Sequence, residues 1–382
     1  MSASAFAFFR GAVELMAADL GASRNTGIEV QLCGDAHLKN FGFFASPGAD
    51  IVLDINDFDQ TQRGPWEWDV KRMATSIVLA GRVAENGEHR TKLAVETFLR
   101  DYIKWIRQFS SMSAIDVARH RITRDSRDPV VRSALRQAER STPQSSLPKL
   151  ARRSPGDSWR FLHKPKLMWE VEGREKKKVL SALPAYRETL APDRRMLFDR
   201  YRAADVGFKV VGTGSVGTRD YVVLLFGRDE ADPLFLQIKE ELPSAYRAYY
   251  ADKTSPEHEG QRVVLGQRAM QVFSDPLLGW CSIEKRGYLV RQLSDHKSSI
   301  EPEELNGHRL AEYSGVCAEL LAKGHARSAE PAVLASYLGK SDKAARALLQ
   351  FAIAYADHTE RDFDLLKKAL KRGFVQSVLK GL

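Results

Sequence analysis

Apolar residues recur at helical spacing toward both ends of the chain. Residues 5–20 form an amphipathic pattern that ends near Gly21. The same spacing of three or four residues recurs in two stretches beyond Trp68, and it returns after Pro302 and continues almost to the end of the sequence. Both ends of the chain are therefore predicted to be mainly helical.

The middle of the chain has a different pattern. Long runs rich in Val, Ile, Leu, Phe and Tyr, interrupted by turn residues, predict strands. The predicted strands lie within 28–32, 51–55, 208–227, 233–242 and 287–293. A helix is predicted at 258–273, between the last two of these strands.

The order of these elements gives the fold class and the boundaries of the domains. The Ser- and Pro-rich segment 141–148 is the best candidate for a linker. We predict an α+β protein in which residues 1–150 and 296–382 form two helical parts. Residues 156–295 form a β-rich domain between them.

Composition limits the class of protein further. Of the 382 residues, 43% are hydrophobic, which is an ordinary globular balance and excludes a wholly disordered chain. The net charge of +9 favours an anionic partner, or else reflects a basic solvated surface. Three widely spaced cysteines indicate neither a disulfide framework nor a zinc site, and no apolar run is long enough for a membrane span. We expect a soluble, cytoplasmic protein without membrane contacts.

Two polar clusters follow one another near the N-terminus. The sequence CGDAHLKNFGFF supplies Asp35, His37, Lys39 and Asn40. The sequence DINDFD, at the end of the next strand, supplies Asp54, Asp57 and Asp59. Carboxylate and carboxamide oxygens of this kind suit Mg²⁺, which needs only one or two protein carboxylates besides phosphate oxygens. The alternative is a pair of turns, where Asp and Asn are common for conformational reasons.

A third cluster lies in the β-rich middle. The glycine-rich sequence GTGSVG at 212–217 has β-prone runs on both sides, so it predicts a hairpin and not the strand-to-helix turn of a dinucleotide site. Its backbone either folds over phosphates or forms a plain hairpin. Lys239 follows within an apolar strand, where a lysine is rarely buried without a partner. Together the glycine loop and the lysine favour nucleotide binding.

These motifs resemble those of known enzymes. GDAHLKN resembles the HGDxHxxN loop of aminoglycoside phosphotransferases and related kinase-like enzymes, and NDFD and GPWEWD resemble their metal-binding IDFD segment and the GPxxxD that opens the next helix. GTGSVG with QIK resembles the glycine loop and the β3 lysine of kinases. From FAFFRG to AYADHTERD, the chain is similar to the bacterial family called domain of unknown function 2252.

The resemblance implies a two-lobed kinase-like fold with a circularly permuted order. Kinases place the glycine loop and lysine before the catalytic loop and the metal aspartate, whereas here the last two come first. Cys33 stands where the related enzymes usually have His. The helix expected to carry an acidic partner for Lys239 offers Glu259, with Glu257 as the second choice.

The resemblance also assigns roles to residues. Asp35 accepts or orients the proton of the acceptor, Asn40 and Asp57 hold Mg²⁺, and Lys239 neutralises the phosphates of ATP. His37 is a further candidate of the catalytic loop, which either tightens the loop or touches the substrate. The nucleotide phosphates are covered by Gly212, Thr213, Gly214, Ser215 and Gly217.

Four other residues have expected roles. Asp69 is expected to brace the catalytic loop from the start of its helix. Asp54 and Asp59 are possible second metal ligands. His325, in a helical stretch, is expected to be a packing residue whose hydrogen bonds are satisfied.

The implied function is an ATP- and Mg²⁺-dependent phosphotransferase that acts on an unidentified hydroxyl of a small molecule or protein. A nucleotide-binding pseudokinase or scaffold is one alternative, and transfer of AMP on the same fold is another. Nucleic-acid binding through the Arg-rich segment 121–153 is disfavoured, because the segment lacks interleaved aromatic residues.

Overall fold

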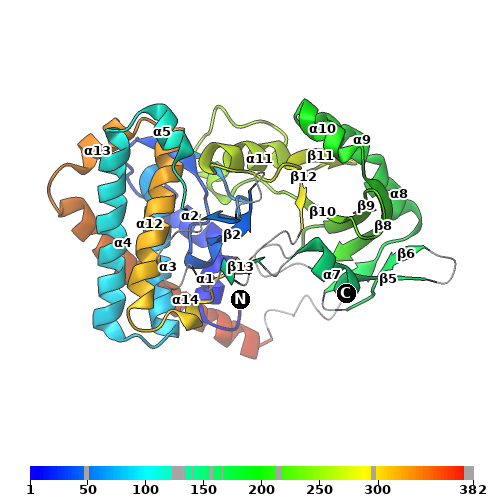
Figure 1. The fold of residues 1–382 in the computed structure, drawn as a ribbon. Coiled ribbons are helices and arrows are strands. Elements are labelled where there is room, and N and C mark those ends of the chain that lie inside the picture. Colours follow the sequence, from blue (N-terminus) through cyan, green and yellow to red (C-terminus); the bar gives the residue numbers. More distant parts are fainter. Residues whose placement is uncertain are drawn as a thin grey trace.

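Helices form one side of the molecule and a six-stranded antiparallel sheet forms the other (Figure 1). This computed structural model describes residues 1–46, 51–122, 132, 135–136, 138–139, 142–154, 158–165, 167–210, 217–293 and 298–373. The α+β class predicted from the sequence is confirmed. No helix in these described ranges is both long and apolar enough to cross a lipid bilayer.

The helical side combines segments from both ends of the chain. Its helices are α1 (Ala5–Gly11), α2 (Val13–Gly21), α3 (Trp66–Val83), α4 (Gly87–Ser110), α5 (Ala114–Arg119), α12 (Arg309–Ser328), α13 (Pro331–Leu338) and α14 (Lys343–Lys371). Helix α4 packs along α12, and α3 packs between α4 and α14. Met73 of α3, Phe98 of α4 and Leu321 of α12 are fully buried in the shared main core. The apolar periodicity near both ends of the sequence therefore reflects one core.

The N-terminal helix differs from the prediction. A single helix over residues 5–20 was expected, but the chain leaves the helical region at Ala12, where φ is −126° and ψ is 46°. The break lies beside the carbonyl of Phe9, which accepts hydrogen bonds from Arg72 Nη2 at 3.0 Å and from Ala12 N at 3.4 Å. A tertiary contact that periodicity does not encode thus accompanies the break.

The sheet has the strand order β11-β12-β10-β9-β8-β7. Its strands are β7 (Met168–Glu170), β8 (Arg202–Lys209), β9 (Asp220–Phe226), β10 (Pro233–Glu240), β11 (Gly279–Ile283) and β12 (Arg286–Gln292). Strands β8 and β9 pair antiparallel on either side of the glycine-rich segment, of which 212–216 lie outside the described residues. Gly217 has a φ of +92°, a conformation that glycine adopts without strain.

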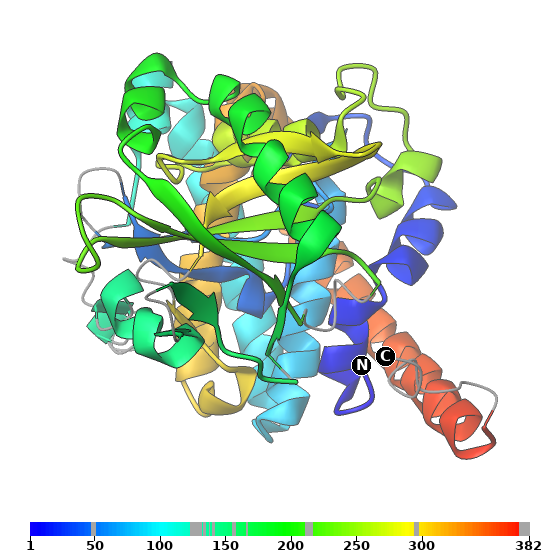
Figure 2. The same cartoon turned by 90° about the vertical axis from the view of Figure 1, so that its right-hand side faces the viewer.

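The helices that pack beside the sheet include one that the sequence predicted and three that it did not. Helix α11 (Glu259–Met270), predicted at 258–273, contacts β11, β12 and α12, and its Val263 and Val264 belong to the main core. Three further helices, α8 (Gly173–Ser181), α9 (Leu183–Glu188) and α10 (Pro192–Phe198), were not predicted. Figure 2 shows these helices in front of the sheet. Their apolar side chains form a second core with one face of the sheet.

The predicted linker at 141–148 is wrong for most of its length. Residues Pro143–Leu150 form helix α7, with proline in the first turn. Thr142 and Ser145 form a reciprocal capping box, in which each side chain accepts a hydrogen bond from the backbone N–H of the other. Ser and Pro residues here start a helix, a role that the composition of the segment does not distinguish from a linker.

Short strands complete the architecture. The pair β1 (Glu29–Leu32) and β4 (Gln62–Pro65) is antiparallel, and so is β5 (Ala151–Arg153) with β6 (Trp159–Phe161). The strands β2 (Phe41–Ala45) and β3 (Ile51–Ile55) pair beside β13 (Ser298–Ser299). Single 3₁₀ turns occur at Leu38–Asn40, Ala245–Ala248 and Pro302–Glu304. These pairs place the segments before β2 and after β3 next to each other.

A buried ion pair fixes β3 against the helices. Both carboxylate oxygens of Asp54 lie at 2.5 Å from Nζ of Lys323 in the middle of α12. Asp54 is 3% exposed and Lys323 is fully buried. Removing one partner of such a pair leaves an uncompensated buried charge, which is far more costly than losing a surface pair.

We predict that Lys323→Met lowers the free energy of unfolding by about 3–5 kcal/mol. The double variant Asp54→Asn/Lys323→Met should lose less than the single variant, because no unpaired charge remains. Lys367→Met is the control, since Lys367 and Asp364 form an exposed pair that should contribute at most ~0.5 kcal/mol. Urea unfolding measures all three. A loss below about 1 kcal/mol in Lys323→Met would contradict the prediction.

Candidate functional site

One face of α3 holds the Asp35 loop, defined as residues 33–40. Asp69, Arg72 and Ser76 are spaced three and four residues apart, so their side chains share a helix face. Asp69 accepts hydrogen bonds from the backbone N–H of Cys33 at 2.8 Å and of Gly34 at 3.0 Å. Ser76 Oγ accepts from Leu38 N at 3.1 Å. The predicted bracing role of Asp69 is confirmed.

Two further residues beside Asp69, His325 and Cys33, are buried. His325 of α12 lies with Nε2 at 3.3 Å from Asp69, and its Nδ1 is 2.7 Å from the hydroxyl of Tyr102. The prediction that His325 is a satisfied packing residue is therefore confirmed. Burial raises the pKa of the Cys33 thiol, and the charge of Asp69 raises it further, so Cys33 is an inert buried thiol.

Gly34 is required where the loop passes the segment after β3. Its φ is +84°, and a Cβ added at this position would lie 2.1 Å from the carbonyl oxygen of Gln60. No other residue fits without movement of one backbone. The Asp35 loop therefore packs directly against residues 56–61, which we call the Asp57 loop.

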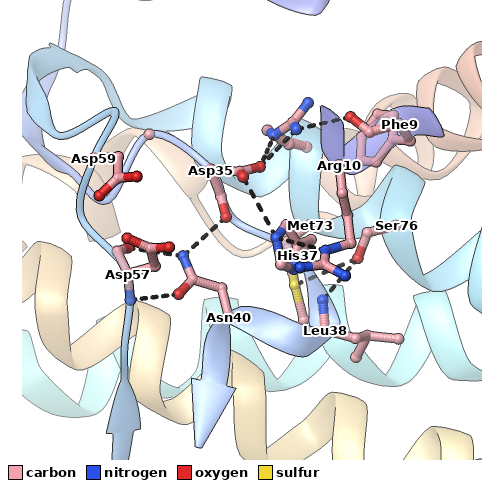
Figure 3. Close-up of polar contacts among 12 residues, drawn as sticks. Phe9, Arg10, Asp35, His37, Leu38, Asn40, Asp57, Asp59, Met73 and Ser76 are labelled. Carbon is pink, nitrogen blue, oxygen red and sulfur yellow. Dashed lines mark hydrogen bonds and ion pairs between the residues drawn. The ribbon is translucent and has the colours of Figure 1, made fainter. Parts of the chain in front are cut away.

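Asp35 forms a partly buried ion pair that the sequence did not reveal. Its Oδ1 accepts from Nε of Arg72 at 2.6 Å and lies 2.5 Å from Nη2 of the same guanidinium. Burial raises the pKa of Asp35, but the charges of Arg72 and His37 outweigh that effect and lower the pKa to about 2. Asp35 is therefore a carboxylate at neutral pH, and its Oδ2 points toward His37 (Figure 3).

His37 is packed inside the loop. Arg10 Nε lies 3.3 Å from its Nε2, and the same nitrogen is 3.4 Å from Oδ2 of Asp35. The side chain is 5% exposed, and burial lowers its pKa, so the ring is mainly neutral at pH 7. These contacts give His37 a role in tightening the loop. Contact of His37 with a substrate stays a prediction.

Asn40 ties the Asp35 loop to the Asp57 loop. Its Nδ2 donates to the backbone carbonyls of Asp35 and Asp57, both at 2.9 Å, and its Oδ1 accepts from Asp57 N at 2.7 Å (Figure 3). The side chain is 1% exposed. An amide oxygen has two lone pairs, so Oδ1 retains one. The predicted metal contact stays a prediction, and the structure adds a bracing role that the sequence did not indicate.

Lys239 of β10 meets the Asp57 loop. Its Nζ forms an ion pair with Oδ2 of Asp59 and lies 3.9 Å from Oδ1 of Asp57. Burial lowers the pKa of Lys239, but the two carboxylates raise it well above its usual value. The lysine is therefore charged, and it links residues that are 180 positions apart in the sequence. The structure brings together three of the residues singled out from the sequence.

The two aspartates have different environments. The Asp57 side chain is 51% exposed, and although burial of its carboxyl raises the pKa, Lys239 and Arg291 lower it overall. Asp59 is 21% exposed, and burial together with the charge of Asp57 raises its pKa, while Lys239 lowers it. Oδ1 of Asp59 is buried without a hydrogen-bond partner. Such an oxygen is available to a ligand or a cation.

Glu259 is not the partner of Lys239. Its carboxylate bonds to Arg247 and to Arg262 Nε, the latter at 2.5 Å. Arg262 in turn donates to the carbonyl oxygens of Asp59 and Thr61. The second choice, Glu257, is exposed, whereas Lys239 is buried. The lysine has the Asp57 loop as its source of negative charge, and α11 contributes an arginine that holds the backbone of that loop.

Several residues of this region do not form part of a metal site in the structure. Asp54, considered as a second metal ligand, has both oxygens on Lys323. Within the described ranges, no group of three or more His, Cys, Asp and Glu side chains has the arrangement of a metal site. Gly212, Thr213, Gly214 and Ser215 lie outside the described residues. Their predicted contact with phosphates stays a prediction.

Sequence reasoning missed four cations that organise the site: Arg72, Arg262, Arg291 and Lys323. Arg72 had a usable signal, because Asp69, Arg72 and Ser76 are spaced to form one polar stripe on a helix that is mostly buried. Lys323 lies among other polar residues of α12, and Arg291 lies beside Gln292 at the end of β12, so neither position had such a signal.

The comparison with protein families gives a match over nearly the whole chain. The model of a family described as "Uncharacterized protein conserved in bacteria (DUF2252)" matches residues 1–369. The chain belongs to this family. The match includes both ends of the helical side and the whole sheet, so the DUF2252 region contains every element of the site. No curated protein and no solved structure matches the chain.

We predict a pH-dependent contribution of Asp35 to stability. Its pKa is lowered from about 3.9 in unfolded chains to about 2, so the charged form stabilises the fold by about 2 kcal/mol above pH 4. This contribution is lost as the pH falls from about 4 to 2. The difference in unfolding free energy between wild type and Asp35→Asn should therefore shrink over this range. A difference that stays constant would show that Arg72 does not control the carboxyl.

Proposed function

We propose that this protein is an ATP- and Mg²⁺-dependent phosphotransferase of kinase-like, circularly permuted fold, acting on an unidentified hydroxyl acceptor. The observation that carries the proposal is the meeting of Lys239 with Asp57 and Asp59 beside the Asp35 loop. Phosphoryl transfer needs positioning and charge neutralisation more than covalent help from the protein. One carboxylate near the acceptor, one carboxylate pair for a metal and one buried lysine supply those needs.

The residues fit a magnesium ion. Asp57 offers an exposed carboxylate, Asp59 offers an oxygen without a hydrogen-bond partner, and Asn40 retains one lone pair on Oδ1. Mg²⁺ binds through one or two protein carboxylates and keeps the rest of its shell for water and phosphate oxygens. When bound, the ion would neutralise negative charge on the phosphates of the nucleotide.

The protein groups have separate tasks in the proposed reaction. Lys239, held charged by its two aspartates, binds phosphate oxygens. Asp35 keeps Oδ1 on Arg72, and its Oδ2, which lies 3.4 Å from Nε2 of His37, is the oxygen that would accept a hydrogen bond from the acceptor hydroxyl. The acceptor oxygen forms a bond to the terminal phosphorus, the bond from phosphorus to the bridging oxygen breaks, and ADP leaves with that electron pair. The acceptor proton passes to Asp35 or to water, and the low pKa of Asp35 favours orientation of the hydroxyl over early removal of its proton.

One observation favours a second candidate, a nucleotide-binding scaffold without turnover. In active protein kinases a glutamate of the helix beside the sheet pairs with the strand lysine. The corresponding acid here, Glu259, pairs with Arg247 and Arg262 instead. The site would then bind the nucleotide while Lys239 stays on the Asp57 loop.

The test is thermal unfolding of the full chain with and without Mg-ATP. Wild type should gain about 2.7 kcal/mol of stability when the ligand is at ~100 times its dissociation constant. Asp57→Asn and Lys239→Met should lose most of this gain, because each removes a phosphate or metal contact. Asp229→Asn and Lys253→Met, both at exposed positions, are the matched controls and should keep it.

The outcomes separate the candidates. Absence of a shift in wild type would overturn nucleotide binding and both candidates with it. Where the shift appears, slow release of ADP from Mg-ATP that disappears in Asp57→Asn supports phosphoryl transfer. Release of pyrophosphate indicates AMP transfer, and release of neither product supports the scaffold.

A further inference from the structure

The sheet face that carries Lys239 is partly covered by the chain itself. Side chains alternate along a strand, so Phe235 and Gln237 share the face of Lys239. Phe235 and its neighbours on β9, Val222 and Leu224, are 0% exposed. They form a third core that also contains Ala151, Phe161 and Met168, with Leu147, Leu150 and Trp159 packed against it. Figures 1 and 2 show α7, β5 and β6 beside the sheet.

This covering leaves little for a nucleobase to stack on. Ligand pockets usually offer hydrophobic or aromatic walls to the apolar part of a ligand. In the described part of the chain, α7, β5 and β6 bury the apolar side chains of β9 and β10 on this sheet face. Leu289 of β12, opposite Lys239, and Trp280 of β11 pack against the main core. The other described neighbours of Lys239 on this face, Asp220, Gln237 and Arg291, are polar.

A continuous chain of polar contacts crosses this polar part of the face, from β8 to the Asp57 loop. Lys209 Nζ lies 3.7 Å from Oδ2 of Asp220, which accepts from Gln237 Nε2 at 2.8 Å. Gln237 Oε1 accepts from Arg291 Nε at 3.0 Å, and Arg291 Nη1 donates to Asn56 O at 3.2 Å. The four side chains come from four neighbouring strands of the sheet.

The donors of this chain are not used up. Two of the five N–H groups of Arg291 have acceptors within the described residues. The Lys209 side chain is 30% exposed, and its contact with Asp220 is longer than a hydrogen bond. Oδ1 of the buried Asp220 has no hydrogen-bond partner. Lys209, Lys239 and Arg291 therefore present three cations beside the exposed carboxylate of Asp57.

We propose that the site recognises its phosphoryl donor through the phosphate chain alone, with Lys209 and Arg291 joining Lys239 as phosphate-binding residues and with no contribution from a base. This inference rests on the proposed function and specifies its donor class as an oligophosphate. Inorganic triphosphate and nucleoside triphosphates then bind alike. Guanidinium and ammonium groups are the side chains that bind phosphate oxygens best.

The test is isothermal titration calorimetry of the full chain with Mg²⁺ and one of three probes: inorganic triphosphate, ATP or GTP. The three dissociation constants should agree within about threefold. Arg291→Met should weaken all three by the same factor, about tenfold or more, because a charge-assisted hydrogen bond contributes ~1.5–3 kcal/mol. Lys209→Met, at a partly exposed position, provides a second variant whose folding is not at risk. Arg228→Met, 86% exposed, is the control and should change nothing.

The relative affinities of the three probes separate this inference from the proposed function. Binding of ATP or GTP at least tenfold tighter than inorganic triphosphate overturns the inference, because the base then contributes and α7 with β5 and β6 must give way to it. In that case the proposed phosphotransferase still stands. Absence of binding by all three probes overturns the proposed function and the inference together. Equal weakening in the control Arg228→Met would show a general charge effect and overturn the roles of Lys209 and Arg291.

Discussion

The buried charge of Lys239 is the constraint on which the site depends. An ammonium group within a sheet strand loses its hydration and is stable only beside a counter-charge. The counter-charge comes from Asp59 and Asp57, which belong to the helical side of the molecule. The ion pair therefore fixes the Asp57 loop against the sheet, and Arg262 of α11 holds the backbone of the same loop. Lys239 and Asp57 meet for an electrostatic reason, whatever reaction they support.

Two other aspartates of the region, Asp35 and Asp54, are also each paired with a buried cation. Asp35 is paired with Arg72 and Asp54 with Lys323, and each cation comes from a helix distant in sequence. The side chain of Asn40 then joins the two loops by three hydrogen bonds to backbone groups of Asp35 and Asp57. Asp57 is the exception, because half of its side chain is exposed and its carboxylate carries the charge that faces solvent. One exposed carboxylate among neutralised ones leaves a local negative charge, which attracts a cation.

The sequence predicted what local physics determines. Periodicity placed the long helices and the central strands of the large sheet, and the clustering of Asp, His and Asn identified both loops. The sequence did not predict three features: the break at Ala12, the helix at Pro143–Leu150 and the pairing of Glu259 with arginines. Each is decided by a contact or a cap within the folded chain. The partner cations were missed for the same reason. The position of Lys323 within α12 gives no indication of which carboxylate it will meet.

The central claim is that Lys239 and the Asp57 loop share one site, and a double-mutant cycle measures it directly. Unfolding free energies of wild type, Lys239→Met, Asp59→Asn and the double variant give the coupling between the two side chains. We expect a favourable coupling of about 1–3 kcal/mol, whereas Lys239→Met combined with Asp229→Asn should be additive. Additivity of Lys239→Met and Asp59→Asn within ~0.3 kcal/mol would contradict the account, because the two groups would then not be in contact.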